Sequence, residues 1–375
     1  MSQVHGNRLI WLSEVPWRGL SQRQHHLVRA LRRSWDVLFI EPPPSLRLPR
    51  RGVRPENGIH VAQVAPVLNT RQASLQRLLS TRAVRGAASV LARRQVGDAV
   101  SARWLDATAA RPVVVASDVF LVAAGAALHP LRLVLDVCDD PRAFPGAPPW
   151  TDEVFRGAVR MADIVTTSSQ TLYEEIRGLR RSASVYYIPN GVRAELLRFQ
   201  PVDKSSRGKI GYLGYIGPWL DLPLIDELAA ALPDRPVELT GPVDPSMAAP
   251  LSRLSTRANV CIKPAVAENE VGRVLAGLAV GIIPFRESPL TRAVNPNKLY
   301  EYAALDLPIV TTAFSPDVVG FDSCVDVCRS TPEFVATVRA RCDGIGLRST
   351  RWIAETHTWA SIAQRFAALL TEEGC

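Results

Sequence analysis

Short apolar runs alternate with helix-like segments along the whole chain. In the first half, strands are predicted at 8–13, 36–40, 59–64, 112–117, 131–137, 163–168 and 183–189. A helix is predicted over 21–34, with Ser21 as its N-cap. Near-continuous apolar strands separated by helices are typical of a parallel sheet that is covered on both faces.

The same pattern starts again after a polar segment at 198–209, which suits an interdomain linker. Strands are predicted at 209–214, 236–241, 259–264, 279–285 and 307–312, with helices at 221–232, 268–278, 297–305 and 357–370. The fold class is therefore α/β, with two doubly wound Rossmann-like domains that face a central cleft. We expect domains at 1–200 and 201–350, and a C-terminal helix at 351–375 that crosses back to the first domain.

Composition supports this organisation, because 375 residues exceed the usual size of one core. No apolar run reaches the length of a membrane span, and the N-terminus lacks a signal-peptide pattern, so we expect a cytoplasmic protein. The six cysteines are scattered without a nearby ligand set, and no metal site is predicted.

Charge is divided unevenly between the two halves. Residues 1–200 carry 27 Arg, no Lys and 16 acidic residues, a balance of +11, whereas the remainder carries 17 basic and 20 acidic residues. A basic first half suits an anionic or lipid-linked acceptor and peripheral contact with the inner face of the membrane, and a solvated surface is the alternative.

Two loops at predicted strand ends carry candidate chemistry. Gly214 and Gly217 lie in "GYLGYIGP", where glycines with positive φ would let the backbone approach a phosphate. A second, long polar loop leads into a helix and contains Arg292, Asn295, Lys298 and Glu301. The last three are spaced by three residues, which predicts one shared helical face. Arg292 and Lys298 suit a diphosphate and Glu301 suits ribose hydroxyls, although a capped, solvated helix explains the same pattern.

Several motifs resemble those of GT-B glycosyltransferases, in the order that this family has them. They are "YYIPNGV", "DIVTTSSQTLYEEI", "IGYLGYIGPWLDLPLIDELA" and "NPNKLYEYAALDLPIVTT". The segment from Trp17 to Leu27 is similar to the "W-x-x-L-x-Q-R-x-x-x-L" of bacterial GT4-like enzymes of cell-wall and polysaccharide assembly. The resemblance implies metal-independent transfer from a UDP-, dTDP- or GDP-linked sugar, with no bound cofactor. We expect no nucleic-acid partner, because the basic residues are dispersed and the sequence has no recognised nucleic-acid-binding module.

The carried-over residues depart from the family pattern at two points. Glu301 matches the second Glu of the family's Glu-x7-Glu motif, but Ala293 stands where the first is expected, which leaves inverting or retaining stereochemistry open. Tyr215 stands where the family has an Arg.

For the acceptor side we expect Asp140, with Asp139 close behind, as the catalytic base, and contacts from Arg23, His25 and His26. A sugar-nucleotide epimerase or hydrolase of the same fold and a non-catalytic basic binding protein are the alternatives.

Overall fold

The computed structural model describes residues 7–43, 49–50, 52–65, 68–104, 111–180, 184–199 and 208–371, and these form two compact units. The first unit contains the described residues up to Ile188 and those from Ile362 onward, and the second runs from Pro189 to Ser361. Most of the predicted linker at 198–209 lies outside the described residues.

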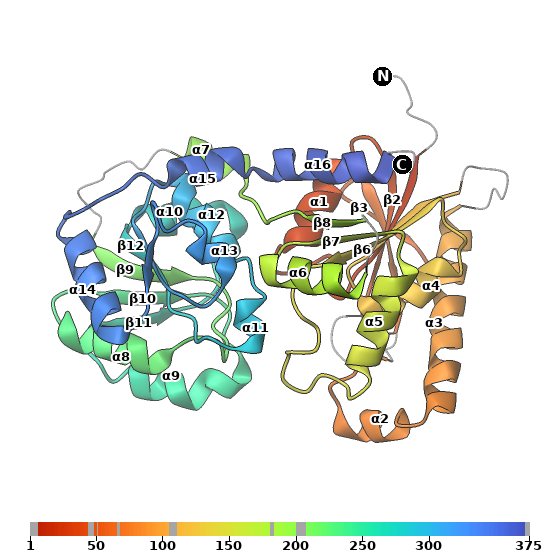
Figure 1. Cartoon of the computed structure of the whole chain (residues 1–375), viewed down its shortest axis with the longest axis horizontal. Coiled ribbons are helices and arrows are strands. Elements are labelled where there is room, and N and C mark those ends of the chain that lie inside the picture. The colour runs from red at the N-terminus through yellow and green to blue at the C-terminus, as the bar shows by residue number, and fades with distance from the viewer. Residues whose placement is uncertain are drawn as a thin grey trace. The chain divides into compact units, whose positions relative to one another are not determined.

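The first unit is built on an eight-stranded sheet with the order β3-β4-β2-β1-β5-β6-β7-β8 (Figure 1). The strands are β1 (Arg8–Leu12), β2 (Asp36–Glu41), β3 (Arg54–Glu56), β4 (Ile59–Gln63), β5 (Val113–Ala116), β6 (Arg132–Val137), β7 (Ile164–Thr167) and β8 (Val185–Tyr187). All neighbours pair in parallel except β3, which is antiparallel to β4. The central strands are almost fully buried, which explains their continuous apolar sequence.

The helices of the first unit connect these strands. They are α1 (Arg23–Leu31), α2 (Ala73–Leu78), α3 (Arg82–Arg103), α4 (Val122–Ala126), α5 (Thr151–Met161) and α6 (Gln170–Leu179). The N-cap of α1 is Gln22, not Ser21 as predicted, because the His25 ring accepts a hydrogen bond from the Gln22 backbone at 3.0 Å.

The second unit has a six-stranded, fully parallel sheet with the order β11-β10-β9-β12-β13-β14. Its strands are β9 (Lys209–Leu213), β10 (Val237–Thr240), β11 (Val260–Lys263), β12 (Leu278–Ile283), β13 (Ile309–Thr312) and β14 (Asp326–Cys328). Its helices are α7 (Ala194–Arg198), α8 (Leu222–Ala231), α9 (Ala248–Leu254), α10 (Val271–Ala276), α11 (Pro289–Arg292), α12 (Asn297–Ala304), α13 (Pro316–Val319), α14 (Thr331–Cys342) and α15 (Arg351–Thr356).

The last helix, α16 (Trp359–Thr371), returns the chain to the first unit. The Phe366 ring stacks on Trp11 of β1 at a centroid distance of 5.8 Å, and the Leu369 carbonyl accepts a hydrogen bond from Arg132. The expected doubly wound α/β fold with a returning C-terminal helix is confirmed. Among the described residues, no helix is both long enough and apolar enough to cross a bilayer.

Candidate functional site

Two glycine turns meet at the carboxyl edge of the second sheet. Gly214 follows β9 with a φ of 140°, and its backbone N–H donates to the Thr240 carbonyl at 2.9 Å. Gly241 follows β10 with a φ of 153°, and a Cβ atom there would lie 2.0 Å from the Gly214 carbonyl oxygen. Only glycine permits this contact between the two backbones, so neither Gly214 nor Gly241 adds a side chain to this edge of the sheet. Sequence reasoning missed Gly241, although it ends a predicted strand.

Gly217 has a different role from the one we predicted. Its φ is not positive, and a Cβ atom there would lie 2.7 Å from the Trp219 ring. Gly217 therefore makes room for the indole, so only Gly214 in this loop has the left-handed backbone that we expected of both glycines.

Lys298, on α12, faces the Gly214 turn. A Cβ atom on Gly214 would lie 2.8 Å from Lys298 Nζ, and this ammonium lies 4.9 Å from the centroid of the Tyr212 ring. The Tyr302 hydroxyl fixes α12 beside the turn, because it accepts a hydrogen bond from the Leu213 backbone at 2.9 Å. The Lys298 ammonium is thus held against the backbone of the Gly214 turn. A cation beside backbone without a side chain is an arrangement that can bind a phosphate.

Glu301 lies one turn after Lys298 and is half-buried. Burial raises the pKa of its carboxyl group, the charges of Lys298 and Arg193 oppose that shift, and Glu268 adds to it. Arg193 Nη1 lies 3.4 Å from Glu268 Oε1. Sequence reasoning missed Arg193, although it directly follows the "IPNGV" motif.

Arg292 and Tyr215 already have partners of their own. Arg292 ends the short helix α11, which interrupts the long loop that we predicted as polar, and its exposed guanidinium pairs with Glu287 at 2.5 Å. The Tyr215 hydroxyl donates to Asp244 Oδ2 at 3.1 Å, and its ring packs on Trp219 with centroids 5.6 Å apart.

Asn295 is buried before the helix instead of lying on its exposed face with Lys298 and Glu301, because α12 begins only after Pro296. Its Oδ1 accepts hydrogen bonds from the Asn190 backbone and the Tyr300 hydroxyl, both at 3.0 Å, and its Nδ2 donates to Asp317 at 3.1 Å. This network joins the "IPNGV" segment to the start of α12, so the Asn295 side chain positions the loop.

On the first unit, Asp139 and Asp140 follow β6 and have different environments. Asp140 accepts hydrogen bonds from Arg142 Nε at 2.8 Å and Nη2 at 3.0 Å, and Arg142 also pairs with Glu175. Asp139 is exposed to solvent, and its carboxylate makes no hydrogen bond or ion pair with the described residues. Of the two candidates for the base, Arg142 therefore engages Asp140 and leaves the Asp139 carboxylate open to solvent.

Glu14 and Asp118 add two more acidic residues to this edge, and sequence reasoning missed both. They follow β1 and β5, and the parallel strand order β1-β5-β6 brings Glu14, Asp118 and Asp139 to one edge of the sheet. Burial raises the pKa of Glu14 to about 8 and of Asp118 to about 6. The Glu14 Oε1 atom accepts from Gln24 at 3.2 Å, whereas its Oε2 atom is buried and has no hydrogen-bond partner among the described residues.

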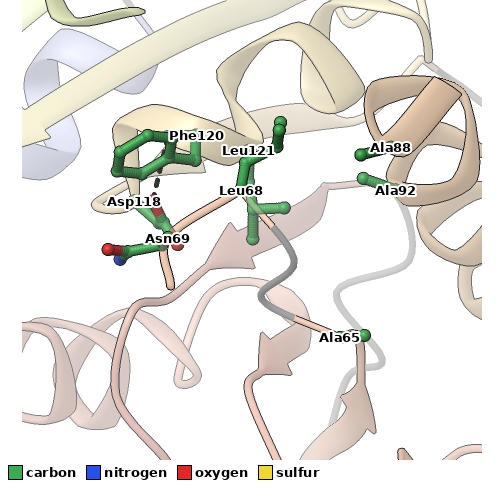
Figure 2. Close-up of a pocket in the computed structure, with 8 residues that line it drawn as sticks. All are labelled: Ala65, Leu68, Asn69, Ala88, Ala92, Asp118, Phe120 and Leu121. Atoms are coloured by element: carbon green, nitrogen blue, oxygen red, sulfur yellow. Dashed lines mark hydrogen bonds between the residues drawn. The ribbon is translucent and has the colours of Figure 1, made fainter. Parts of the chain in front are cut away.

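Figure 2 shows Asp118 beside Asn69 at the polar end of a small pocket, with a hydrogen bond of 2.9 Å from the Phe120 backbone. The rest of the lining is apolar: Ala65, Leu68, Ala88, Ala92, Phe120 and Leu121. Across the described part of the chain, no three Asp, Glu, His or Cys side chains form a group that could hold a metal.

Arg23 and His25 are built into the first unit. Arg23 is buried against Asp136, with Nε 3.0 Å from Oδ2. The His25 ring is buried beside Trp17, accepts from the Gln22 backbone through Nδ1 and donates from Nε2 to the Pro16 carbonyl at 3.0 Å. These contacts favour structural roles, whereas His26 is half-buried.

Comparison with solved structures identifies the fold. HepE from Anabaena, solved with UDP and glucose, has a TM-score of 0.66 and 15% identity, and the match covers 98% of this chain and 100% of HepE. Sucrose-phosphate synthase from Thermosynechococcus elongatus has a TM-score of 0.72 and 14% identity, with 97% and 98% covered. α,α-Trehalose 6-phosphate synthase from Burkholderia multivorans has a TM-score of 0.70 and 12% identity, also with 97% and 98% covered. The chain has the GT-B fold.

A comparison of sequences adds one curated relative. TuaH of Bacillus subtilis (strain 168), named for a glycosyltransferase role in teichuronic acid biosynthesis, is 31% identical over 163 residues. The match spans 41% of this chain and 41% of TuaH. No protein-family model matches the sequence.

Proposed function

We propose that this GT-B chain is a glycosyltransferase that moves a sugar from a nucleotide-diphosphate sugar to an acceptor hydroxyl during polysaccharide assembly. The observation that carries the proposal is the placement of Lys298 against the Gly214 turn, with Glu301 one helical turn further on. TuaH supports the sugar-transfer chemistry and HepE, solved with UDP and glucose, supports a UDP-linked donor.

In this proposal, positive charge binds the diphosphate of the donor and hydrogen bonds bind its ribose. The Lys298 ammonium neutralises the diphosphate, and the glycine backbone of the Gly214 turn lets that group approach closely. The Glu301 carboxylate accepts hydrogen bonds from the ribose hydroxyls. The same lysine stabilises the negative charge that develops on the departing diphosphate. This favours cleavage of the bond between the anomeric carbon and the diphosphate oxygen.

On the acceptor side, we place the general base at Asp139 in preference to Asp140. Asp140 is engaged by Arg142, whereas the exposed carboxylate of Asp139 makes no hydrogen bond or ion pair with the described residues and can accept a proton from a hydroxyl. Asp139 would take the proton of the acceptor hydroxyl as its oxygen attacks the anomeric carbon. We propose a cytoplasmic reaction on an anionic or lipid-linked acceptor.

The first experiment is a thermal-shift screen against UDP-, dTDP- and GDP-linked sugars. A ligand at a hundred times its dissociation constant stabilises the folded state by about 2.7 kcal/mol. We expect a UDP-sugar to raise the melting temperature of the wild-type chain more than that of Lys298→Ala. The absence of any shift with all three donor classes would contradict the proposed function.

Product analysis then distinguishes transfer from the other reactions of this fold. We expect the sugar to appear on the acceptor, with little donor breakdown when acceptor is omitted. Equal donor consumption without acceptor would indicate a hydrolase, and a changed sugar still attached to its nucleotide would indicate an epimerase. Asp139→Asn should lower kcat and leave UDP affinity unchanged, whereas unchanged turnover would exclude Asp139 as the base.

A further inference from the structure

Helices α2 and α3 carry a long stretch of the chain without acidic residues (Figure 1, orange). The 41 positions between Glu56 and Asp98 contain six Arg and neither Asp nor Glu. Three exposed cations of these helices, Arg77, Arg93 and Arg94, have no ion-pair partner among the described residues. This part of the first unit therefore presents positive charge that no acidic side chain of the described residues pairs with.

The two long faces of α3 are both rich in apolar residues. The inward face buries Ala88, Ala92 and Val96. The outward face has Ala83, Ala87, Val90, Leu91 and Arg94 at positions i, i+4, i+7, i+8 and i+11, a helical stripe. Val90 is 63% exposed and Leu91 is 45% exposed. A surface helix normally shows polar residues on that side, whereas here Val90 and Leu91 are exposed and no described residue covers them.

Helix α2 shows the same combination. None of its residues is buried, and Leu78 is 64% exposed beside Arg77. Leu75 is exposed as well, and only residues 79–81 separate this helix from α3. Exposed leucines next to unpaired arginines thus recur on two consecutive helices.

We propose that α2 and α3 dock the protein onto an anionic lipid bilayer. The α2–α3 surface, defined as Leu75, Arg77, Leu78, Val90, Leu91 and Arg94, would place its apolar side chains at the boundary between headgroups and acyl chains. Its arginines would contact lipid phosphates. Interfacial helices combine these two features, with apolar residues that enter the membrane and basic residues that contact anionic headgroups. This inference does not depend on the reaction that the enzyme catalyses.

A second copy of this chain fits the surface less well. In a symmetric dimer the same patch occurs on both sides of the interface, so the arginines of one copy would face those of the other. A bilayer with anionic lipids instead offers negative charge and an apolar layer together, and each Arg near such a surface contributes about fivefold to binding.

The test is co-sedimentation of the full chain with vesicles of phosphatidylcholine, with and without phosphatidylglycerol. We expect binding to the anionic vesicles at low salt, little binding to pure phosphatidylcholine, and loss of binding as salt screens the charges. Absence of binding to the anionic vesicles at low salt would overturn the proposal, as would equal binding to both kinds of vesicle.

A double variant of two arginines tests whether binding depends on the charge of the α2–α3 surface. Arg77→Gln with Arg94→Gln should weaken vesicle binding roughly 25-fold, about fivefold for each arginine. The charge-matched control is Arg253→Gln with Arg329→Gln, two exposed arginines of the second unit, and it should bind like wild type. An equal loss in the control would show that only net charge matters and would contradict a defined surface.

Leu78→Ser with Leu91→Ser tests the apolar contribution separately. Its control is Ile345→Ser with Leu347→Ser, which are 62% and 54% exposed in the second unit. We expect the first pair alone to lose binding, with the melting temperature of both variants unchanged. Size-exclusion chromatography without lipid tests the alternative occupant. If the wild type self-associates and the Leu78→Ser, Leu91→Ser variant does not, a second copy occupies the surface and the proposal is wrong.

Discussion

The surroundings of individual charged residues separate Lys298 from Arg292, which the sequence alone treated as equivalent. Lys298 faces the glycine turn, whereas Arg292 is exposed and paired with Glu287. Similarly, the sequence pointed to Asp139 and Asp140 because they follow a strand, but it gave no sign of Glu14. A single acidic residue after a strand is usually solvated, and only the packing of α1 shows that Glu14 is covered.

Lys298→Ala should weaken UDP binding by at least about tenfold, since a charge-assisted contact to phosphate contributes roughly 1.5–3 kcal/mol. Arg292→Ala should have a much smaller effect because its guanidinium is already paired. Isothermal calorimetry with UDP and with uridine measures both, and uridine affinity should stay constant in Lys298→Ala. Equal losses for UDP and uridine would indicate general damage to the fold.

Glu301 should make nucleoside binding depend on pH. Only the ionised carboxylate accepts two hydrogen bonds from ribose, and its pKa is raised by burial, so affinity should fall as the pH drops through this raised value. Uridine titrations of the wild type and Glu301→Gln at several pH values measure this effect. The variant should bind weakly with a flat profile, and an unchanged slope in the variant would assign the titration to another group.

Glu14 should lower the stability of the protein as the pH rises. Its folded-state pKa of about 8 lies above its unfolded value, so the folded state binds more protons in between. The free energy of unfolding therefore decreases from about pH 5 to about pH 8, where the buried carboxylate must ionise. Urea denaturation of Glu14→Gln should show a shallower decline than the wild type, and identical slopes would show that Glu14 is not buried in solution.

At the scale of elements, the apolar pattern predicted most strands because buried parallel strands have continuous apolar sequences. Strand β3 escaped prediction because it is short, polar and contains Pro55, a residue that edge strands tolerate. Asn295 was assigned to a helical face by its spacing alone. Pro296 lies outside the helix as its N-cap, so the chain before it takes another direction.

Asn295→Ala should therefore act mainly on stability. It removes one buried hydrogen bond each from the Asn190 backbone N–H, the Tyr300 hydroxyl and Asp317, and such a bond contributes about 0.5–1.5 kcal/mol. Urea denaturation should show this loss, while UDP affinity of the remaining folded protein should change less than in Lys298→Ala. A fully stable variant with lost UDP affinity would instead assign Asn295 to the donor, as the sequence suggested.

At the scale of the whole molecule, the chain passes through the second unit before it completes the first. The sequence predicted this return from the final amphipathic helix, and the stacking of Phe366 on Trp11 shows how the helix is held. Sequence alone could not show which strand it covers, because an apolar helical stripe does not identify its partner.

Phe366→Ala should destabilise the first unit selectively. Removal of a fully buried aromatic ring typically costs about 3–5 kcal/mol. Urea unfolding followed by hydrogen exchange should show loss of protection in the strands of the first unit and little change in β9–β14. A uniform loss of protection across both units would indicate that they unfold together.

The return of α16 also constrains the order of events on the ribosome. Residues 189–361 of the second unit form one continuous segment, so this unit can fold as soon as it emerges. The first unit is synthesised earlier, yet Trp11 keeps an uncovered face until Phe366 leaves the exit tunnel. The first unit therefore stays incomplete while the whole of the second unit is synthesised, and its uncovered apolar face is a surface that chaperones would bind during that time.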